Sequence, residues 1–88
     1  MRKWKITLQR KAAKQLRKLP KAIQDMAFEF MEDLESEGTV PKHWDVKKTN
    51  DNEYRVRINY RYRMRYRVGQ EELIIEVFYI GHRKEAYQ

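Results

Sequence analysis

Arginine recurs at every second position along one stretch of this chain. Between residues 54 and 68 the even positions are apolar or aromatic, and six odd positions are Arg55, Arg57, Arg61, Arg63, Arg65 and Arg67. The planar guanidinium group suits phosphate oxygens and stays charged at neutral pH. A row of such groups repels itself unless an anion lies among them. We therefore expect this segment to bind a polyphosphate, and RNA is the one we favour.

The charge of the whole chain agrees with that expectation. Twenty basic residues stand against 13 acidic ones, which gives a net charge of +7 and a pI near 9.8. A soluble domain with a lysine-rich surface has a similar balance, so charge alone decides little. The clustering of arginines on one strand face favours nucleic acid, which binds through phosphate neutralisation and counterion release.

Length and composition exclude several classes of protein. With 88 residues, we expect one small domain over residues 1–88. The absence of cysteine excludes disulfides and thiolate metal sites. The acidic residues form no close pair suited to a metal, so we expect neither a metal nor a cofactor. No apolar run approaches the length of a membrane span or a signal peptide, and we expect a cytoplasmic protein without membrane contact.

The hydrophobic periodicity predicts the elements that position the arginines. Residues 3–8 alternate as a strand, and the apolar spacing predicts helices over 9–19 and from Pro20 to Gly38. Residues 39–52 are mostly loop, with a possible short strand at 44–47, and residues 73–80 form a hydrophobic strand. The order β-α-α-β-β-β predicts an α+β fold, in which a helical hairpin packs on a mainly antiparallel sheet of about four strands.

The long alternation needs a turn, because strands usually run about 5–6 residues. We place that turn at 59–61, since a three-residue loop pairs Ile58 with Tyr62 and keeps both apolar rows inside. This register sets Arg57 opposite Arg63 and Arg55 opposite Arg65.

The second hairpin, across residues 69–72, is expected to pair Val68 with Leu73. That pairing sets Arg65 opposite Glu76 and Arg63 opposite Phe78, with Arg67 at the periphery. The expectation is therefore that Arg65 is structural, and that uncompensated charge remains on Arg55, Arg57 and Arg63.

Three short motifs resemble a known family. A hydrophobic strand leads into Tyr79-Ile80-Gly81-His82-Arg83-Lys84-Glu85-Ala86-Tyr87, a helical hairpin carries Leu19-Pro20-Lys21, and two arginine strands begin at Tyr54 and Tyr62. Their order and spacing resemble the RelE branch of the RelE/ParE toxins of toxin–antitoxin pairs, over essentially the whole chain. The turn Ile58-Asn59-Tyr60-Arg61 departs from the Gly-Asp-Tyr-Arg turn of that family.

The resemblance implies a ribonuclease that enters the ribosomal A site and cuts messenger RNA without a metal. By position, it assigns catalytic roles to Arg55, Arg57, Arg63, Arg83 and Tyr87. Arginine cannot act as a base at neutral pH, so these arginines suit electrostatic stabilisation of the phosphorane. Tyr87 is the candidate base for the 2′-hydroxyl, and His82 is the alternative acid or base.

Further contacts and partners follow from the same charge. We expect RNA-binding contributions from Lys47, Lys48, Arg61 and Arg65. An antitoxin with an acidic or amphipathic segment would silence the cationic face. Two other functions remain open: the gyrase-inhibiting ParE branch of the same fold, and an RNA-binding module without catalysis.

Overall fold

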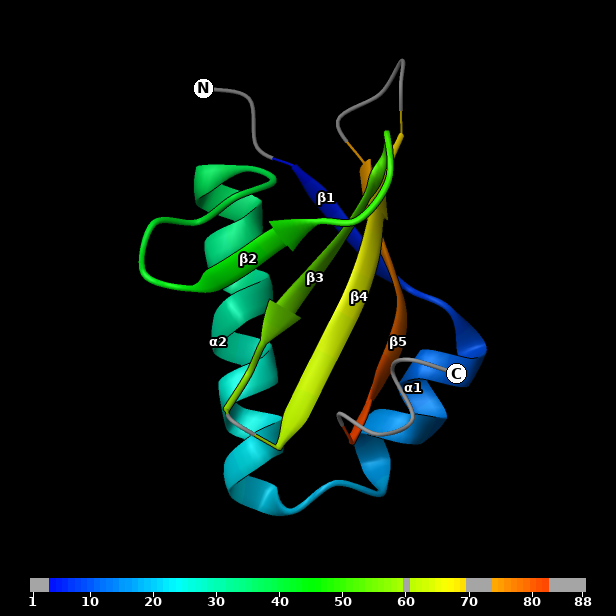
Figure 1. Ribbon diagram of the computed structural model, residues 1–88. Helices are drawn as coiled ribbons and strands as arrows, with labels where there is room; N and C mark the ends of the chain where they lie inside the picture. Colours follow the sequence, from blue (N-terminus) through cyan, green and yellow to red (C-terminus); the bar gives the residue numbers. More distant parts are fainter. Residues whose placement is uncertain (1–3, 60, 70–73, 83–88) are drawn as a thin grey trace.

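The computed structural model describes residues 4–59, 61–69 and 74–82, which contain two helices and five strands (Figure 1). In chain order these are β1 (Lys5–Leu8), α1 (Arg10–Arg17), α2 (Lys21–Glu37), β2 (Asp45–Lys48), β3 (Glu53–Arg57), β4 (Tyr62–Val68) and β5 (Ile74–His82). The predicted α+β class and the order of the elements are confirmed. The strand count is five instead of about four, because the possible short strand near residue 45 does form.

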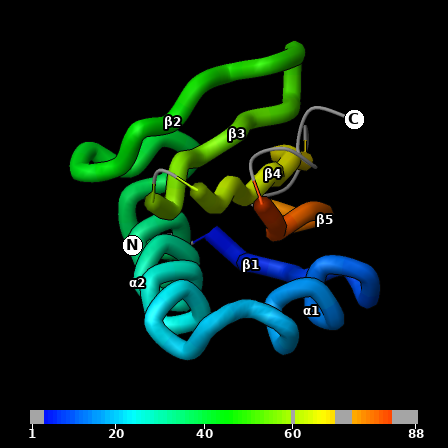
Figure 2. The backbone as a smooth tube through the Cα atoms, turned by 60° about the horizontal axis from the view of Figure 1, so that its bottom comes forward, coloured from blue at the N-terminus to red at the C-terminus, as the bar shows by residue number. Residues whose placement is uncertain are grey.

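The five strands form one mixed sheet in the order β1-β5-β4-β3-β2. β1 runs parallel to β5, and every other neighbouring pair is antiparallel. Both helices lie on the same side of this curved sheet, as the view along it shows (Figure 2). The opposite face of β2, β3 and β4 is therefore not covered by a helix, and the outward-pointing arginines lie there.

The apolar spacing of the two helices explains which face each one buries. α1 buries Ala12 and Leu16, four residues apart, while its basic side chains remain exposed. α2 buries five apolar residues at three- and four-residue spacing: Ile23, Ala27, Phe30, Met31 and Leu34. Gly38 ends α2 with a positive φ of 96°, and its amide donates a hydrogen bond to the carbonyl of Leu34 at 3.0 Å.

The register predicted for the first hairpin is confirmed. Ile58 donates its amide proton to the carbonyl of Tyr62 at 3.0 Å, and Arg57 lies opposite Arg63. Val56 and Met64 form an inward pair within this ladder and are fully buried. Asn59 stabilises the turn, because its side-chain oxygen accepts from the backbone amides of residues 61 and 62. This is the role that asparagine commonly has in turns.

The register predicted for the second hairpin is wrong. Val68 pairs with Ile75 instead of Leu73, and Glu76 lies opposite Arg67 instead of Arg65. A shift of two residues preserves which side chains face inward, so the apolar pattern alone could not distinguish the two registers.

A β-bulge then shifts the register by one further residue. Tyr66 pairs with Val77 and Arg65 pairs with Tyr79, so Phe78 has no direct partner on β4. The bulge is what allows Val77 and Ile80, three residues apart, both to be buried. It also places Gly81, instead of the expected Phe78, opposite Arg63.

An aromatic cluster connects the sheet to α2. The ring of Phe30 lies 5.0 Å from that of Trp44 and 5.6 Å from that of Tyr66, and Tyr54 stacks on Tyr66 at 5.5 Å. The buried Tyr66 hydroxyl donates to the carbonyl of Thr39. Burial, together with the neighbouring Tyr54, raises the pKa of Tyr66 above its usual range. The cluster fixes the segment after α2, and with it the start of β2.

Candidate functional site

The outward-facing side chains form rows across the open face of the sheet. One row runs Asp45, Arg57, Arg63, Gly81; the next runs Lys47, Arg55, Arg65, Tyr79; the third runs Glu53, Arg67, Glu76. The first two rows carry most of the positive charge, and the third alternates in sign. The arginine face that appears uniform in the sequence is therefore divided by its cross-strand neighbours.

A small hollow lies where the first two rows meet. Its lining residues are Asp45, Lys47, Arg55, Arg57 and Arg63, and we call it the cationic hollow. Four cations and one carboxylate converge there from β2, β3 and β4. Such a cluster suits a phosphate group, because guanidinium groups offer several fixed N–H donors to its oxygens.

Asp45 belongs to this hollow, and the sequence-based set of site residues did not include it. Its carboxylate lies 3.5 Å from Nε of Arg57, and both side chains are about half exposed. The expectation that Arg57 lacks a counter-charge is therefore wrong. The possible strand at 44–47 was the feature of the sequence that could have revealed Asp45 as a site residue. The register of that strand against β3 places Asp45 opposite Arg57.

Arg63 differs from the other cations of the hollow in being buried, with 6% of its surface exposed. Its Nη1 donates to the carbonyls of Asn59 at 3.1 Å and Tyr62 at 3.3 Å. Arg63 and Arg55 also take part in further interactions, so neither is without a partner. The hydrogen bonds fix the Arg63 guanidinium near the turn between β3 and β4, whereas the guanidinium of Arg57 lies in a half-exposed ion pair.

The two carboxylates of the third row pair with one arginine of the second row and with the arginine of their own row. Arg65 lies 3.7 Å from the carboxylate of Glu53, and Arg67 lies 3.8 Å from that of Glu76. Both guanidinium groups also lie over the ring of Phe78, at 5.3 Å and 4.3 Å from its centroid. Arg65 is thus offset by Glu53, and not by Glu76 as expected. Arg67 does not line the cationic hollow, which agrees with the peripheral position expected for it.

The remaining described candidates do not line the hollow, and two further candidates lie outside the described residues. Lys48 is exposed on β2, and Arg61 is exposed in the β3–β4 turn. His82 is half-buried at the end of β5, and its ring meets that of Tyr62 edge-on at 5.7 Å. The other two predicted catalytic residues, Arg83 and Tyr87, lie outside the described residues.

Neither a metal centre nor a membrane helix is present in the described part of the chain. Within residues 4–59, 61–69 and 74–82, no three His, Cys, Asp or Glu side chains gather in a way that could hold a metal ion. The two helices in these ranges are also too short or too polar to cross a membrane. The basic residues of the cationic hollow can bind anions.

Known proteins of the same fold match this geometry. A chain of the archaeal RelE–RelB complex from Pyrococcus horikoshii OT3 is 26% identical, with a TM-score of 0.77 over 91% of this chain and 94% of that one. A chain of the RelB–RelE complex from Methanococcus jannaschii is 23% identical, with a TM-score of 0.77 over 92% and 94%. The isolated E. coli RelE toxin is 18% identical, with a TM-score of 0.74 over 96% and 90%.

The sequence itself matches one family model over nearly its full length. No curated protein matches the chain. The matching model is described as the ParE toxin of the type II toxin–antitoxin system parDE, and the match covers residues 6–87. Together with the RelE-like fold, this match confirms the resemblance inferred from the motifs. The chain belongs to the ParE toxin family of type II toxin–antitoxin systems, within the RelE/ParE superfamily.

Proposed function

We propose that this toxin is a single-domain endoribonuclease that cuts messenger RNA in the ribosomal A site and so stops translation in the cytoplasm. The cationic hollow is the observation that carries the proposal. It lies on the face of the sheet opposite the two described helices, where Lys47 and Arg57 are exposed to an approaching RNA strand. One phosphate in the hollow would meet donors from three strands, and such contacts bind and orient a phosphodiester.

The proposed reaction uses the RNA's own 2′-hydroxyl as nucleophile. A base removes the 2′-hydroxyl proton, the 2′-oxygen bonds to the adjacent phosphorus, and the bond from phosphorus to the 5′-oxygen breaks. An acid gives a proton to that leaving oxygen. The products are a 2′,3′-cyclic phosphate and a 5′-hydroxyl, and the reaction requires neither a metal nor a cofactor.

Arginine groups supply the electrostatic part of this reaction. Arg55, Arg57 and Arg63, with Arg83 after β5, would bind the phosphate oxygens as negative charge accumulates on the phosphorane. The hydrogen-bonded guanidinium of Arg63 is already fixed in place, so it loses little freedom on binding.

Proton transfer needs a group that can lose and regain a proton near neutral pH, and arginine stays protonated there. We assign the base to Tyr87, because neighbouring arginines would favour its phenolate. His82, at the end of β5, is the alternative acid or base.

Further basic residues would guide the strand. Lys47 on β2 lines the hollow itself, and Lys48 on β2 and Arg61 in the β3–β4 turn are additional exposed cations. Arg65 remains a candidate contact, although its ion pair with Glu53 lowers the charge that it offers to RNA.

A protein partner completes the proposal. The similar chains from Pyrococcus horikoshii and Methanococcus jannaschii belong to complexes with RelB. We propose that this toxin likewise binds a cognate antitoxin, whose acidic or amphipathic segment covers the cationic hollow.

Induced expression followed by mapping of messenger-RNA 5′ ends tests the nuclease proposal. The wild type should arrest growth and produce new 5′ ends at fixed codon positions, whereas Tyr87→Phe and Arg57→Ala should lose both while remaining folded. Full toxicity of both variants would contradict the nuclease proposal.

The same experiment separates the two competing functions. A gyrase inhibitor deserves comparison because the matching family model is that of ParE. It would produce DNA breaks, leave messenger RNA intact and tolerate the loss of Tyr87. A purely RNA-binding module would instead show salt-sensitive RNA affinity without any new 5′ ends.

A further inference from the structure

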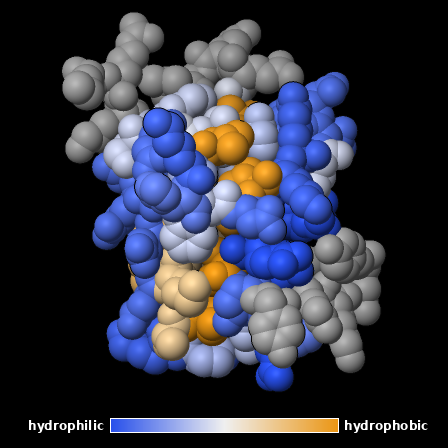
Figure 3. Space-filling view, turned by 60° about the vertical axis from the view of Figure 1, so that its left-hand side comes forward, coloured by the Kyte–Doolittle hydropathy of each residue, from blue (hydrophilic) through white to orange (hydrophobic). Residues whose placement is uncertain are grey.

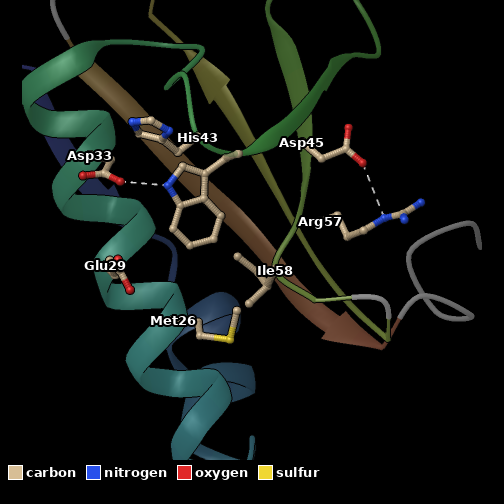
Figure 4. Close-up of a pocket in the computed structure, with 8 residues that line it drawn as sticks. Met26, Glu29, Asp33, His43, Asp45, Arg57 and Ile58 are labelled. Carbon is tan, nitrogen blue, oxygen red and sulfur yellow. Dashed lines mark hydrogen bonds and ion pairs between the residues drawn. The ribbon is translucent and has the colours of Figure 1, made fainter.

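A second concave region lies between α2 and the start of β2 (Figure 4). It is an open pocket of about 480 Å³, and we call it the seam pocket. Its lining residues are Met26, Glu29, Asp33, His43, Trp44, Asp45, Arg57 and Ile58. Asp45 and Arg57 also line the cationic hollow, so the two concavities adjoin at these residues.

The floor of the seam pocket is apolar and firmly held. Met26, Trp44 and Ile58 supply it, and Trp44 donates from Nε1 to a carboxylate oxygen of Asp33 at 2.8 Å. The edge-on contact with Phe30 holds the indole from another side. The pocket therefore offers a preformed aromatic and aliphatic surface to a ligand.

One wall of the seam pocket is acidic. Glu29 and Asp33 lie one turn apart on α2, and Asp33 points toward the indole of Trp44 (Figure 4). α2 as a whole carries six acidic residues and one lysine, a net charge of −5 in a chain whose total is +7. This wall attracts a cation and repels a phosphate, so the chemistry of the seam pocket is opposite to that of the hollow.

The face of the molecule on the side of α2 also carries exposed apolar surface. Seen from the side of α2, an apolar strip runs along this face between two hydrophilic borders (Figure 3). Val40, which follows α2, is 55% exposed. A strip of this kind suits an extended protein segment better than a small solute.

We propose that the seam pocket receives an arginine or lysine side chain from the antitoxin segment that covers the cationic hollow. The aliphatic stem of that side chain would pack on Met26 and Ile58, and its charged end would meet Glu29 and Asp33, with Trp44 adding a cation–π contact. The inference rests on the proposed antitoxin pairing and is independent of the nuclease chemistry.

The acidic wall of the seam pocket lies next to the cationic hollow, and this arrangement would let the toxin discriminate between its antitoxin and RNA. A protein segment with a basic anchor next to acidic residues complements the seam pocket and the hollow together. An RNA backbone carries only negative charge, so it complements the hollow and is repelled by α2.

Nuclear magnetic resonance of the ¹⁵N-labelled full chain tests the proposal directly. The chain has two tryptophans, so the indole signal of Trp44 reports on the pocket and that of Trp4 serves as the internal control. N-acetyl-arginine amide at millimolar concentration should shift the Trp44 signal saturably, and the neutral isostere N-acetyl-citrulline amide should bind at least threefold more weakly. Glu29→Gln should weaken the arginine response by a similar factor. Glu32→Gln, with the same charge change on α2 outside the pocket, should not.

Three results would overturn the inference. They are an equal response to the arginine and citrulline probes, an unchanged Trp44 signal, or a stronger response to guanosine monophosphate, which would mark the pocket as a nucleotide site. None of these measurements depends on cleavage, so a toxin that proves not to be a nuclease leaves the test intact.

Discussion

At the scale of single residues, the arginines of the open face differ in what holds them. Arg57 is tied to Asp45 in a half-exposed ion pair, Arg63 is buried and bonded to two backbone carbonyls, and Arg65 is offset by Glu53. Exposed ion pairs contribute little to stability, so Arg57 can exchange its partner for a phosphate at small cost. Arg63 both stabilises the β3–β4 turn through its hydrogen bonds and lines the cationic hollow.

Asp45→Asn should strengthen RNA binding. The change removes the one carboxylate that lines the cationic hollow, and an exposed charge of this kind is worth about 0.5 kcal/mol, or roughly twofold in affinity at low salt. Fluorescence anisotropy with a labelled single-stranded RNA measures the effect. Asp51→Asn, an equal charge change in the exposed β2–β3 loop, is the control. An equal gain in RNA affinity in both variants would mean that the position of Asp45 in the hollow does not matter for binding.

Arg63→Ala should lower the free energy of unfolding by about 1–2 kcal/mol, because it leaves two carbonyls near the turn without their donor. Urea denaturation measures this cost. Arg61→Ala, at an exposed turn position, should change stability by no more than about 0.5 kcal/mol. A similar cost in both variants would contradict the structural role of Arg63.

At the scale of elements, the site depends on how β2 and the two hairpins are positioned. β2 brings Asp45 and Lys47 beside β3, and the segment before β2 is fixed by Trp44, Tyr66 and the end of α2. The bulge in β5 places Gly81, which has no side chain, beside Arg63. The hollow is thus a product of several elements that meet at one end of the sheet.

Gly38→Ala should destabilise the protein by about 1–3 kcal/mol, since the residue adopts a φ of 96° that other residues avoid. A Cβ at this position would also lie only 3.1 Å from Nε1 of Trp4. Thermal and urea unfolding measure the loss. Ser36→Ala, two residues earlier on the exposed side of α2, is the control, and a loss of equal size there would argue against the backbone explanation.

Tyr66→Phe should destabilise the protein at pH 7 by about 1 kcal/mol, because the hydrogen bond to the Thr39 carbonyl is lost. The pKa of Tyr66 is raised in the folded state, so its contribution is complete below the unfolded value of about 10 and falls as the pH rises above it. The difference between wild type and variant should therefore narrow above pH 10. Urea unfolding at pH 7 and pH 10.5 measures it, and a constant or growing difference would refute the buried-phenol argument.

At the scale of the whole molecule, positive and negative charge are separated. α2 carries −5 and the rest of the chain +12, and the helix lies on the side of the sheet away from the cationic hollow. This separation orients an RNA strand toward the open face before any contact forms. The same separation means that an antitoxin must complement a negative surface on α2 and a positive surface at the hollow.

RNA affinity should therefore depend on salt in proportion to the cations in the hollow. Four phosphate contacts on a single strand predict a slope of log affinity against log salt of about −3. Lys47→Ala should reduce the slope by about 0.7, whereas Lys11→Ala on the exposed face of α1 should leave it unchanged. Equal changes in both variants would mean that binding is spread over the whole surface.

Local patterns in the sequence were enough to predict the fold class, the helices and the first hairpin. Apolar spacing identifies a helix or a strand because side chains repeat every 3.6 or every 2 residues. An odd-numbered loop keeps both rows of the β3–β4 hairpin facing inward, and the turn placed at residues 59–61 then pairs Ile58 with Tyr62. The family resemblance followed from motifs that lie in the same linear order.

Tertiary structure decided which arginines share a site and what opposes them. Alternation fixes the face of a side chain but not its neighbour across the sheet, since a two-residue shift leaves every residue on the same face. The bulge at Phe78, the entry of Asp45 from β2 and the burial of Arg63 all depend on packing between segments distant in the chain. The sequence thus determined a cationic face for an anionic partner, and only the packed sheet decided that one carboxylate and a fixed guanidinium lie at its centre.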